Sequence, residues 1–565
     1  MTLETISVAS VSDAYLHLLA KRGVDFLFAN AGTDFAPIIE SLARSGSGQE
    51  NRAPQAVPIT HENVAVGMAH GYYLVTGRPQ AVMLHVNVGT ANGLCALMNA
   101  ARENVPILLT AGRTPLTDGK RPGARSAPIH WAQEMFDQAG MLREMVKWDY
   151  ELRNGEQIET VVDRALSIAM SEPKGPVYLT LPREVLGDPL NDFSYHVPSR
   201  MPANTPPVPA QDTWGEVAGL ISKAKKPLII AGASGRHHSI VKSLGDFAAR
   251  FAIPVVEYWS SYLCLPTDHP MHLGFESAPH AQEADLILML DCDVPWIPAQ
   301  TDLSNDCKII HIATDPLFSR YPIRNFSCDI GIASPSWLAL PSLHEALEKM
   351  LPESAVRERR ALIKERHDRL RAKAAEAVDN SRMTMTYVSA CVDAAKEDTS
   401  IVVNEYPLRR AQMSFSEPGT FFDQCSSAGL GFGLPAALGI KLAAPERDVI
   451  VATGDGSYLF GNPVACHHTA SSLNLPILTI VCNNQGWGAV ERATRSMYPD
   501  GNAAAKNRVP LSTISSAPDY EKIVEACGGY GERVDDPSDL PAALRRALTV
   551  VRTEGRQALL NVICE

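Results

Sequence analysis

Acidic and amide side chains follow two successive apolar runs near the C-terminal end of the sequence. The turn Gly454-Asp455-Gly456-Ser457 follows the first run, and the pair Asn483-Asn484 follows the second. Both runs are typical of buried parallel strands, whose ends meet at one edge of a sheet. Asp455, the side chain of Asn484 and a backbone carbonyl near Gly486 would then offer three oxygen ligands to a hard cation such as Mg²⁺.

Such a partial cage predicts a diphosphate site, because Mg²⁺ keeps its other octahedral positions for water and phosphate oxygens. Gly454 and Gly456 would let the backbone approach the diphosphate closely, and the N-terminus of the following helix would add amide donors. We therefore expect Gly454, Asp455, Gly456, Ser457 and Asn484 to bind a cofactor, with Asp455, Asn484 and Gly486 as metal ligands. The alternative is that the two segments are ordinary turns.

The GDG turn followed by the NN pair resembles the binding motif for thiamine diphosphate (ThDP), which is also called thiamine pyrophosphate. The chain as a whole resembles the acetolactate synthase and benzoylformate decarboxylase group of ThDP enzymes. The segment Thr60-His61-Glu62 resembles the family's glutamate motif, which implies that Glu62 shares a proton with the pyrimidine ring of ThDP. Without the resemblance, a glutamate at a helix N-terminus is commonly a capping residue.

The same resemblance implies roles for four further residues, Leu430, Ala428, Thr33 and His85. In the segment Cys425–Ala437, Leu430 would be the wedge that bends ThDP into a V shape, and the carbonyl of Ala428 would accept a hydrogen bond from the pyrimidine amino group. Thr33 aligns with a serine that contacts the substrate carboxylate, and His85 aligns with an active-site histidine that exchanges protons with the substrate. A packing segment and a structural histidine are the corresponding alternatives.

Two departures from the family pattern leave the reaction open. No histidine stands at 294–298, where benzoylformate decarboxylase has one in its middle domain, and Val490 stands where pyruvate decarboxylase has a glutamate. A 2-keto acid decarboxylase or carboligase remains the main hypothesis. A 2-hydroxyacyl-CoA lyase or oxalyl-CoA decarboxylase type of lyase, or a catalytically silent ThDP-fold regulatory protein, are the alternatives. FAD is possible in the middle domain but is not predicted, because we see no fingerprint for it.

Composition narrows the class of protein. The chain has 565 residues, 45% of them hydrophobic, and a net charge of −12. These values favour a globular protein of about three domains over a disordered chain, and they argue against a nucleic-acid partner. The eleven cysteines form no C-x-x-C pair, and the sequence shows no apolar run long enough to cross a membrane. We expect reduced thiols and a cytoplasmic enzyme.

Helix and strand patterns alternate in three successive parts of the chain, which predicts an α/β fold with three doubly wound parallel-sheet domains. Their predicted bounds are 1–190 for the pyrimidine-binding domain, 205–350 for a central Rossmann-like domain, and 375–565 for the diphosphate- and Mg-binding domain. The segment 357–373 is expected to be a solvated helix between domains. The resemblance further implies self-association as a homodimer or homotetramer, and a small 2-keto acid or 2-hydroxy ketone as substrate.

Overall fold

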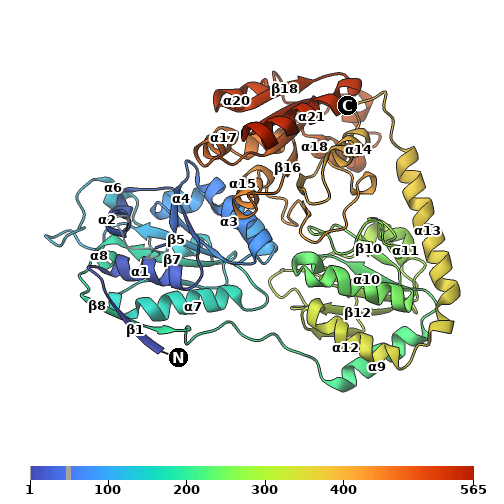
Figure 1. The fold of residues 1–565 in the computed structure, drawn as a ribbon, viewed down its shortest axis with the longest axis horizontal. Coiled ribbons are helices and arrows are strands. Elements are labelled where there is room, and N and C mark those ends of the chain that lie inside the picture. Colours follow the sequence, from blue (N-terminus) through green and yellow to red (C-terminus); the bar gives the residue numbers. More distant parts are fainter. Residues whose placement is uncertain (1, 46–52) are drawn as a thin grey trace. The chain divides into compact units, whose positions relative to one another are not determined.

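The computed structural model describes residues 2–45 and 53–565 and gathers them into two compact units. One unit comprises Met1–Thr205, Cys425–Glu446 and Ser457–Leu475, and the other comprises Pro206–Gln424, Arg447–Gly456 and Pro476–Glu565. Three separate parallel sheets form, each flanked by helices, so the predicted fold class is confirmed (Figure 1). The predicted domain boundaries stay predictions.

The first sheet holds six parallel strands in the order β3-β2-β4-β5-β7-β6. Its strands are β2 (Phe26–Ala29), β3 (Gln55–Pro58), β4 (Gln80–Leu84), β5 (Ile107–Arg113), β6 (Asp149–Glu151) and β7 (Val177–Pro182). The helices of this part of the chain are α1 (Val11–Lys21), α2 (Ala36–Ser45), α3 (Glu62–Thr76), α4 (Val86–Asn92), α5 (Leu94–Arg102), α6 (Ile129–Ala132), α7 (Ile158–Met170) and α8 (Arg183–Leu186). In Figure 1, α1 and α7 lie along one side of the sheet and α3 lies on the other. Every residue of β4 and β7 is buried, as expected for strands covered on both faces.

The C-terminal sheet repeats this arrangement with the order β15-β14-β16-β17-β19-β18. Its strands are β14 (Ile401–Glu405), β15 (Phe421–Asp423), β16 (Val449–Gly454), β17 (Leu478–Asn483), β18 (Tyr530–Val534) and β19 (Ala558–Ile563). The helices here are α14 (Met385–Ala395), α15 (Gly433–Ala443), α16 (Asp455–Phe460), α17 (Pro463–Ser472), α18 (Gly488–Met497), α19 (Asn502–Ala505), α20 (Tyr520–Ala526) and α21 (Leu540–Thr549). Numbered within each sheet, the strands of both sheets run second, first, third, fourth, sixth, fifth.

The central sheet has five parallel strands in the order β10-β9-β11-β12-β13. They are β9 (Pro227–Ala231), β10 (Val255–Glu257), β11 (Leu286–Leu290), β12 (Lys308–Ala313) and β13 (Ile330–Ala333). The helices are α9 (Gln211–Lys223), α10 (Ser239–Phe251), α11 (Ala278–Ala281) and α12 (Ser336–Glu348). β13 was not predicted from the sequence, and its burial pattern is mixed because it is an edge strand.

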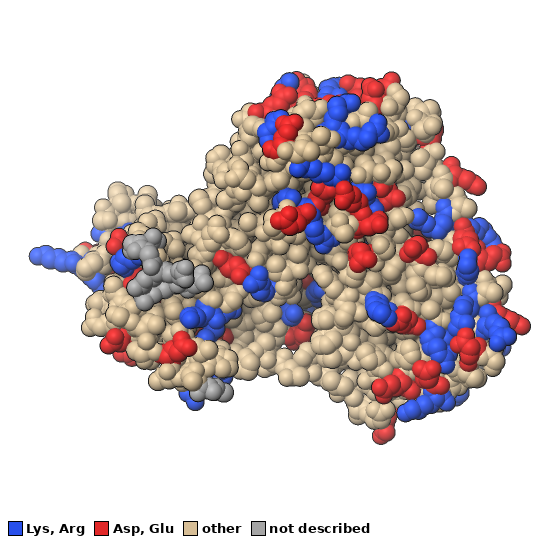
Figure 2. All heavy atoms as spheres, in the orientation of Figure 1, with Lys and Arg blue, Asp and Glu red and all other residues tan. Residues whose placement is uncertain are grey.

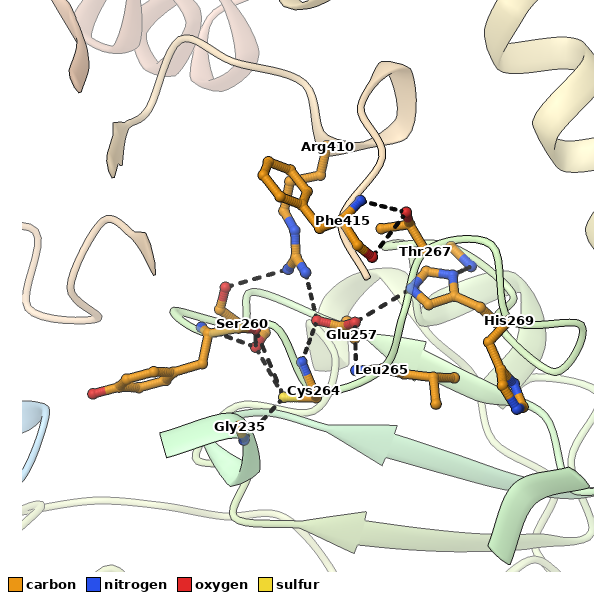
Figure 3. A network of polar contacts seen from close by, with 12 residues as sticks. Gly235, Glu257, Ser260, Cys264, Leu265, Thr267, His269, Arg410 and Phe415 are labelled. Atoms are coloured by element: carbon orange, nitrogen blue, oxygen red, sulfur yellow. Dashed lines mark hydrogen bonds and ion pairs between the residues drawn. The ribbon is translucent and has the colours of Figure 1, made fainter. Parts of the chain in front are cut away.

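A buried ion-pair network joins the central sheet to the segment after β14 (Figure 3). Glu257 lies 2.5 Å from the Arg410 guanidinium and 3.3 Å from the His272 ring, and it accepts backbone N–H bonds from Cys264 and Leu265. Complete burial alone would raise the pKa of Glu257, but Arg410 and His272 together hold it at about 2. This network is internally balanced, so it fixes structure and leaves no charge for a ligand.

Helices α3 and α15 pack unusually closely within their unit. A Cβ atom at Gly71 would overlap the backbone of Ala436, and one at Gly439 would overlap the backbone of Met68. Small residues thus let the two backbones touch. Because α3 begins at Glu62 and α15 follows the segment 425–432, this contact fixes two predicted cofactor-binding segments relative to each other.

Two further elements complete the description. The strands β1 (Thr2–Ser7) and β8 (Asp192–Val197) pair as an antiparallel ribbon, which the sequence analysis missed. Helix α13 (Arg357–Glu376) forms as predicted, and its basic and acidic side chains alternate over the face seen in Figure 2. Within residues 2–45 and 53–565, no helix has the length and hydropathy needed to cross a bilayer. None of the eleven cysteines, all of which lie in the described residues, forms a disulfide.

Candidate active site

His85 and Asp34 form a close pair where the chain leaves β4 and β2. The Nδ1 atom of His85 lies 2.5 Å from Oδ1 of Asp34, and Asp34 is almost fully buried. The hydrogen bond to Asp34 raises the pKa of His85, against the opposing effect of partial burial. In this sheet β3 and β4 lie on opposite sides of β2, so the pair stands at the topological switch point, the usual ligand site of such sheets.

Backbone features around the pair show that its position is tightly constrained. A Cβ atom at Gly32 would overlap the His85 ring, and one at Gly112 would overlap the Asp34 carboxylate. Val86, directly after His85, has φ 33° and donates its N–H to Asp34 at 3.4 Å. A β-branched residue in this conformation is strained, and such strain is typical of functional sites.

Thr33 differs from the expectation in its contacts. Its side chain is exposed, and its backbone carbonyl accepts a 3.3 Å hydrogen bond from Arg183. It is the next residue, Asp34, that contacts His85. The assignment of Thr33 to the substrate carboxylate therefore stays a prediction, and Asp34 is a functional candidate that the sequence analysis missed.

Glu62 begins α3 and is buried, with 8% of its surface exposed. Asn92, at the end of α4, donates a 3.1 Å hydrogen bond to Oε2 of Glu62. A Cβ atom at Gly89 would lie 3.3 Å from the other carboxylate oxygen, which shows that glycine leaves space on that side. Glu62 is thus a buried acid held by one amide, as its proposed role requires.

The segment with Ala428 and Leu430 is anchored on α5. Asn99 accepts hydrogen bonds from the Ser427 hydroxyl at 2.6 Å and the Gly429 N–H at 3.0 Å, and it donates to the Gly429 carbonyl at 2.9 Å. Ala428 itself is exposed with φ 51°, and Leu430 is half-buried. The buried Asn99 therefore holds the loop, while the two predicted cofactor contacts stay accessible.

Three oxygen atoms converge after β16 and β17. The amide oxygen of Asn484 lies 3.3 Å from Oδ1 of Asp455 and 2.9 Å from the carbonyl oxygen of Gly486. Three acceptors that face one another repel unless the amide turns over or a cation lies between them. Neighbouring ligands of an octahedral Mg²⁺, with bonds of about 2.0–2.1 Å, lie about 3 Å apart. The donor set and its spacing therefore fit Mg²⁺.

Asp455 supplies the only carboxylate of this cluster, and it is 2% exposed. Burial raises its pKa, while the backbone N–H groups of Gly456 and Gly486 partly compensate. Among the residues that the structure describes, no three His, Cys, Asp or Glu side chains gather as a metal site. The cluster depends instead on one carboxylate, one amide and one carbonyl.

Gly454 and Gly456, which flank Asp455, differ in their surroundings. A Cβ atom at Gly456 would overlap the Trp487 ring, so this glycine makes room for an indole. Open space surrounds the Cβ position of Gly454. Ser457 lies in α16, and Asn483 faces away from the cluster, because it donates to Asn561 at 3.1 Å.

Two titratable residues with shifted pKa values were not identified from the sequence. His130 is buried, and its pKa is lowered by burial and by the charges of Arg183, Arg125 and His85. Asp423, at the end of β15, has its pKa raised to about 6 by burial. A spacing pattern could not reveal either residue, because their partners come from distant segments.

Glu491 is not available as a substitute for the glutamate expected at position 490. Its carboxylate pairs with Arg495 at 2.9 Å, one turn along α18. Val490 itself is exposed.

Comparisons with known proteins define the class. The N-terminal ThDP-binding domain of thiamine pyrophosphate enzymes matches residues 9–141, the central domain matches 215–324, and the C-terminal ThDP-binding domain matches 406–562. The chain therefore belongs to the thiamine pyrophosphate enzyme family, and the predicted cofactor ThDP is confirmed at that level.

Relatives place it in a narrower group. The chain is 27% identical to benzoylformate decarboxylase of Pseudomonas aeruginosa over 85% of its length and 87% of the relative. It is 25% identical to the large subunit of acetolactate synthase isozyme 3 of Escherichia coli, over 97% of this chain and 93% of that one. It is an enzyme of the acetolactate synthase and benzoylformate decarboxylase-like group.

Solved structures share the fold over the full length. A ThDP-dependent 4-hydroxybenzoylformate decarboxylase of Rhodococcus jostii RHA1 has a TM-score of 0.76 at 23% identity, and benzoylformate decarboxylase of Polynucleobacter necessarius has 0.79 at 20%. Each likeness covers 99% of both chains.

Proposed function

We propose that this enzyme breaks or forms the carbon–carbon bond next to the carbonyl group of a 2-keto acid or 2-hydroxy ketone. ThDP supplies the electron sink for such a reaction when it is bound. The observation that carries the proposal is the group of three oxygens from Asp455, Asn484 and Gly486, which fits a Mg²⁺ ion that would hold the cofactor's diphosphate.

The N-terminal residues supply the proton chemistry in this proposal. Glu62, which is kept in place by Asn92, would hold the proton that it shares with the pyrimidine ring of bound ThDP. His85, whose pKa is raised by Asp34, holds a proton at its ring and donates it to the carbonyl oxygen of the substrate. Thr33 would orient the substrate carboxylate, and the segment with Ala428 and Leu430 would hold the bound cofactor.

Two observations bear on the outcome of the reaction. The hydrogen bond to Asp34, which raises the pKa of His85, favours decarboxylation, because His85 is then better able to act as the acid that delivers the final proton. Val490 favours ligation, because it stands where pyruvate decarboxylase has a glutamate, and a valine cannot protonate the product before an acceptor carbonyl captures it. Decarboxylation with ligation as a second activity is the function that these residues support best.

The proposal includes self-association. The family resemblance implies that the pyrimidine-binding part of one subunit faces the diphosphate-binding part of another, so the smallest active unit would be a homodimer. Sedimentation of the enzyme with and without ThDP and Mg²⁺ tests this directly. An active monomer would contradict it.

The variant Glu62→Gln tests the proposed function. It should lose at least about 100-fold in turnover, which is the usual size of a lost acid–base contribution, while it still binds ThDP. Glu40→Gln, on the exposed face of α2, is the matched control and should behave as the wild type. CO₂ release and acyloin formation are followed separately with pyruvate, benzoylformate and branched 2-keto acids.

Unchanged turnover in Glu62→Gln would overturn the assigned role of this residue. Wild-type enzyme that takes up ThDP but converts none of these substrates would support a catalytically silent protein instead.

A further inference from the structure

A second feature of the N-terminal unit points to a ligand. A cavity of about 470 Å³ opens between the loop at 119–126 and the starts of α2 and α8. Four cationic residues line it, and none of its lining residues is acidic: the cations are Lys120, Arg121, Arg125 and Arg183. In a chain with a net charge of −12, this is a local reversal of sign.

The positive charge of the cavity is only partly neutralised. Arg121 pairs with Asp188 at 2.7 Å, and Arg125 pairs with Glu134, both carboxylates lying outside the lining. Lys120 and Arg183 form no ion pair with any carboxylate in the described part of the chain. Two cations that make no ion pair among the described residues therefore line the cavity.

Arg183 is held in place by neutral groups alone. It donates to the carbonyl oxygens of Gly123 at 2.6 Å, Ala124 at 2.9 Å and Thr33 at 3.3 Å. Carbonyl acceptors orient a guanidinium without cancelling its charge, so it can still attract a carboxylate or phosphate.

The cavity adjoins the candidate active site. Arg183 directly contacts Thr33, the neighbour of Asp34. A Cβ atom at Gly32 would overlap the His85 ring, and Asp34 is hydrogen-bonded to that ring. The segment Gly32–Asp34 thus contacts both the cavity-lining Arg183 and His85, which places the cavity beside the candidate active site.

We propose that this cavity binds a second anionic group, a carboxylate or phosphate, at the far end of the carbonyl substrate. The inference rests on the proposed function and makes it narrower: the preferred substrates carry an anion in addition to the 2-keto carboxylate. An anion placed here would gain charge-assisted hydrogen bonds that a neutral chain cannot form.

The test compares substrates that differ only in the distal charge. Oxaloacetate, 2-oxoglutarate and 2-oxoadipate are each paired with the monoacid of equal carbon number, and kcat/KM is measured for holoenzyme. Wild type should prefer at least one diacid by about 10-fold or more, and the chain length of that diacid reports the distance to the cavity. Glyceraldehyde 3-phosphate against glyceraldehyde, as acceptors, tests phosphate in the same way.

Two variants and a control test whether the cavity causes the preference for diacid substrates. Lys120→Gln should lower the ratio of diacid to monoacid kcat/KM by about 3- to 10-fold, and Lys120→Gln with Arg183→Gln should remove the preference. Lys225→Gln, an exposed lysine on the central part of the chain, is matched in charge and should keep the wild-type ratio.

Direct binding separates failure of this inference from failure of the proposed function. Calorimetry of holoenzyme with unreactive glutarate and valerate should show tighter binding of glutarate, and Lys120→Gln should weaken it. Equal kcat/KM within every substrate pair, or no binding of glutarate, would refute anion binding in the cavity and leave the proposed reaction unaffected. If ThDP binds and no keto acid is turned over, the proposed function is refuted. The glutarate measurement then decides by itself whether the cavity binds anions.

Discussion

The N-terminal and C-terminal sheets have the same strand order but carry different chemistry at equivalent positions. In both sheets the third strand ends at the predicted site: β4 leads to His85, and β16 leads to Asp455. His85 is already paired with a carboxylate, whereas Asp455 belongs to a group of oxygens that face one another. The first arrangement is a charge-assisted hydrogen bond, and the second fits either a bound cation or an Asn484 amide that has turned over.

The comparison shows that topology determines where a site forms but not what it does. At the N-terminal switch point, glycines at 32 and 112 make room for an imidazole–carboxylate pair. After β16, the glycine at 456 makes room for Trp487, and the chain beyond β17 brings a carbonyl oxygen towards the amide of Asn484. Side-chain volume at the strand ends therefore selects the chemistry.

Replacing Asp455 should have the largest effect. Asp455→Ala removes the carboxylate of the proposed Mg²⁺ site, and we expect turnover to fall by about 10³-fold, equivalent to roughly 4 kcal/mol. Asp500→Ala, an exposed aspartate of the same unit, is the control. Steady-state kinetics at saturating ThDP and Mg²⁺ measure the loss, and near-normal turnover would refute the cation site.

Replacing Asp34 should have the next largest effect on turnover, and it should also change the pH dependence of the rate. Asp34→Asn removes the group that raises the pKa of His85, so turnover should fall by about 10²-fold and the alkaline limb of the pH–rate profile should move to lower pH. Cofactor uptake should not change. A profile that keeps its alkaline limb would show that His85 is not the group that titrates.

The increase in thermal stability on cofactor binding should differ between variants of the N-terminal site and variants of the C-terminal site. ThDP with Mg²⁺ at 100 times the dissociation constant should stabilise the wild type by about 2.7 kcal/mol. The shift of the thermal transition should persist in Asp34→Asn and disappear in Asp455→Ala. A chelator should abolish it in the wild type. Equal shifts in both variants would remove the distinction between the sites.

The pH dependence of stability should show the smallest effect. Because Asp34 raises the pKa of His85 in the folded state, this pair stabilises the protein below the unfolded value of about 6.5, and the contribution is lost as pH rises through the folded pKa. The difference between wild type and Asp34→Asn in urea unfolding should be at most about 1 kcal/mol at pH 6 and smaller at pH 9. A difference that grows with pH would have the wrong sign.

The sequence predicted those parts of the site that depend on short spacing. Asp455 and Asn484 follow strands that apolar runs identify, and the three-sheet fold follows from the alternation of helix and strand patterns. Glu62 and His85 needed the family resemblance as well, because a lone glutamate or histidine at a strand end has many structural roles.

Residues whose roles depend on distant partners could not be predicted. Asp34 becomes significant only when β2 and β4 are adjacent, and Asn99 only when the segment after β15 lies on α5. The ion pair of Glu257 and Arg410 joins residues that are 153 positions apart in the sequence. No local pattern contains such information.

The contact between α3 and α15 has a consequence for how this enzyme can change. Because the backbones at Gly71 and Ala436 leave no room for even one methyl group, the acid at the start of one helix and the loop before the other cannot drift independently. A substitution that changes the substrate range is therefore expected to be tolerated more readily in the exposed 119–126 loop than at the contact between α3 and α15.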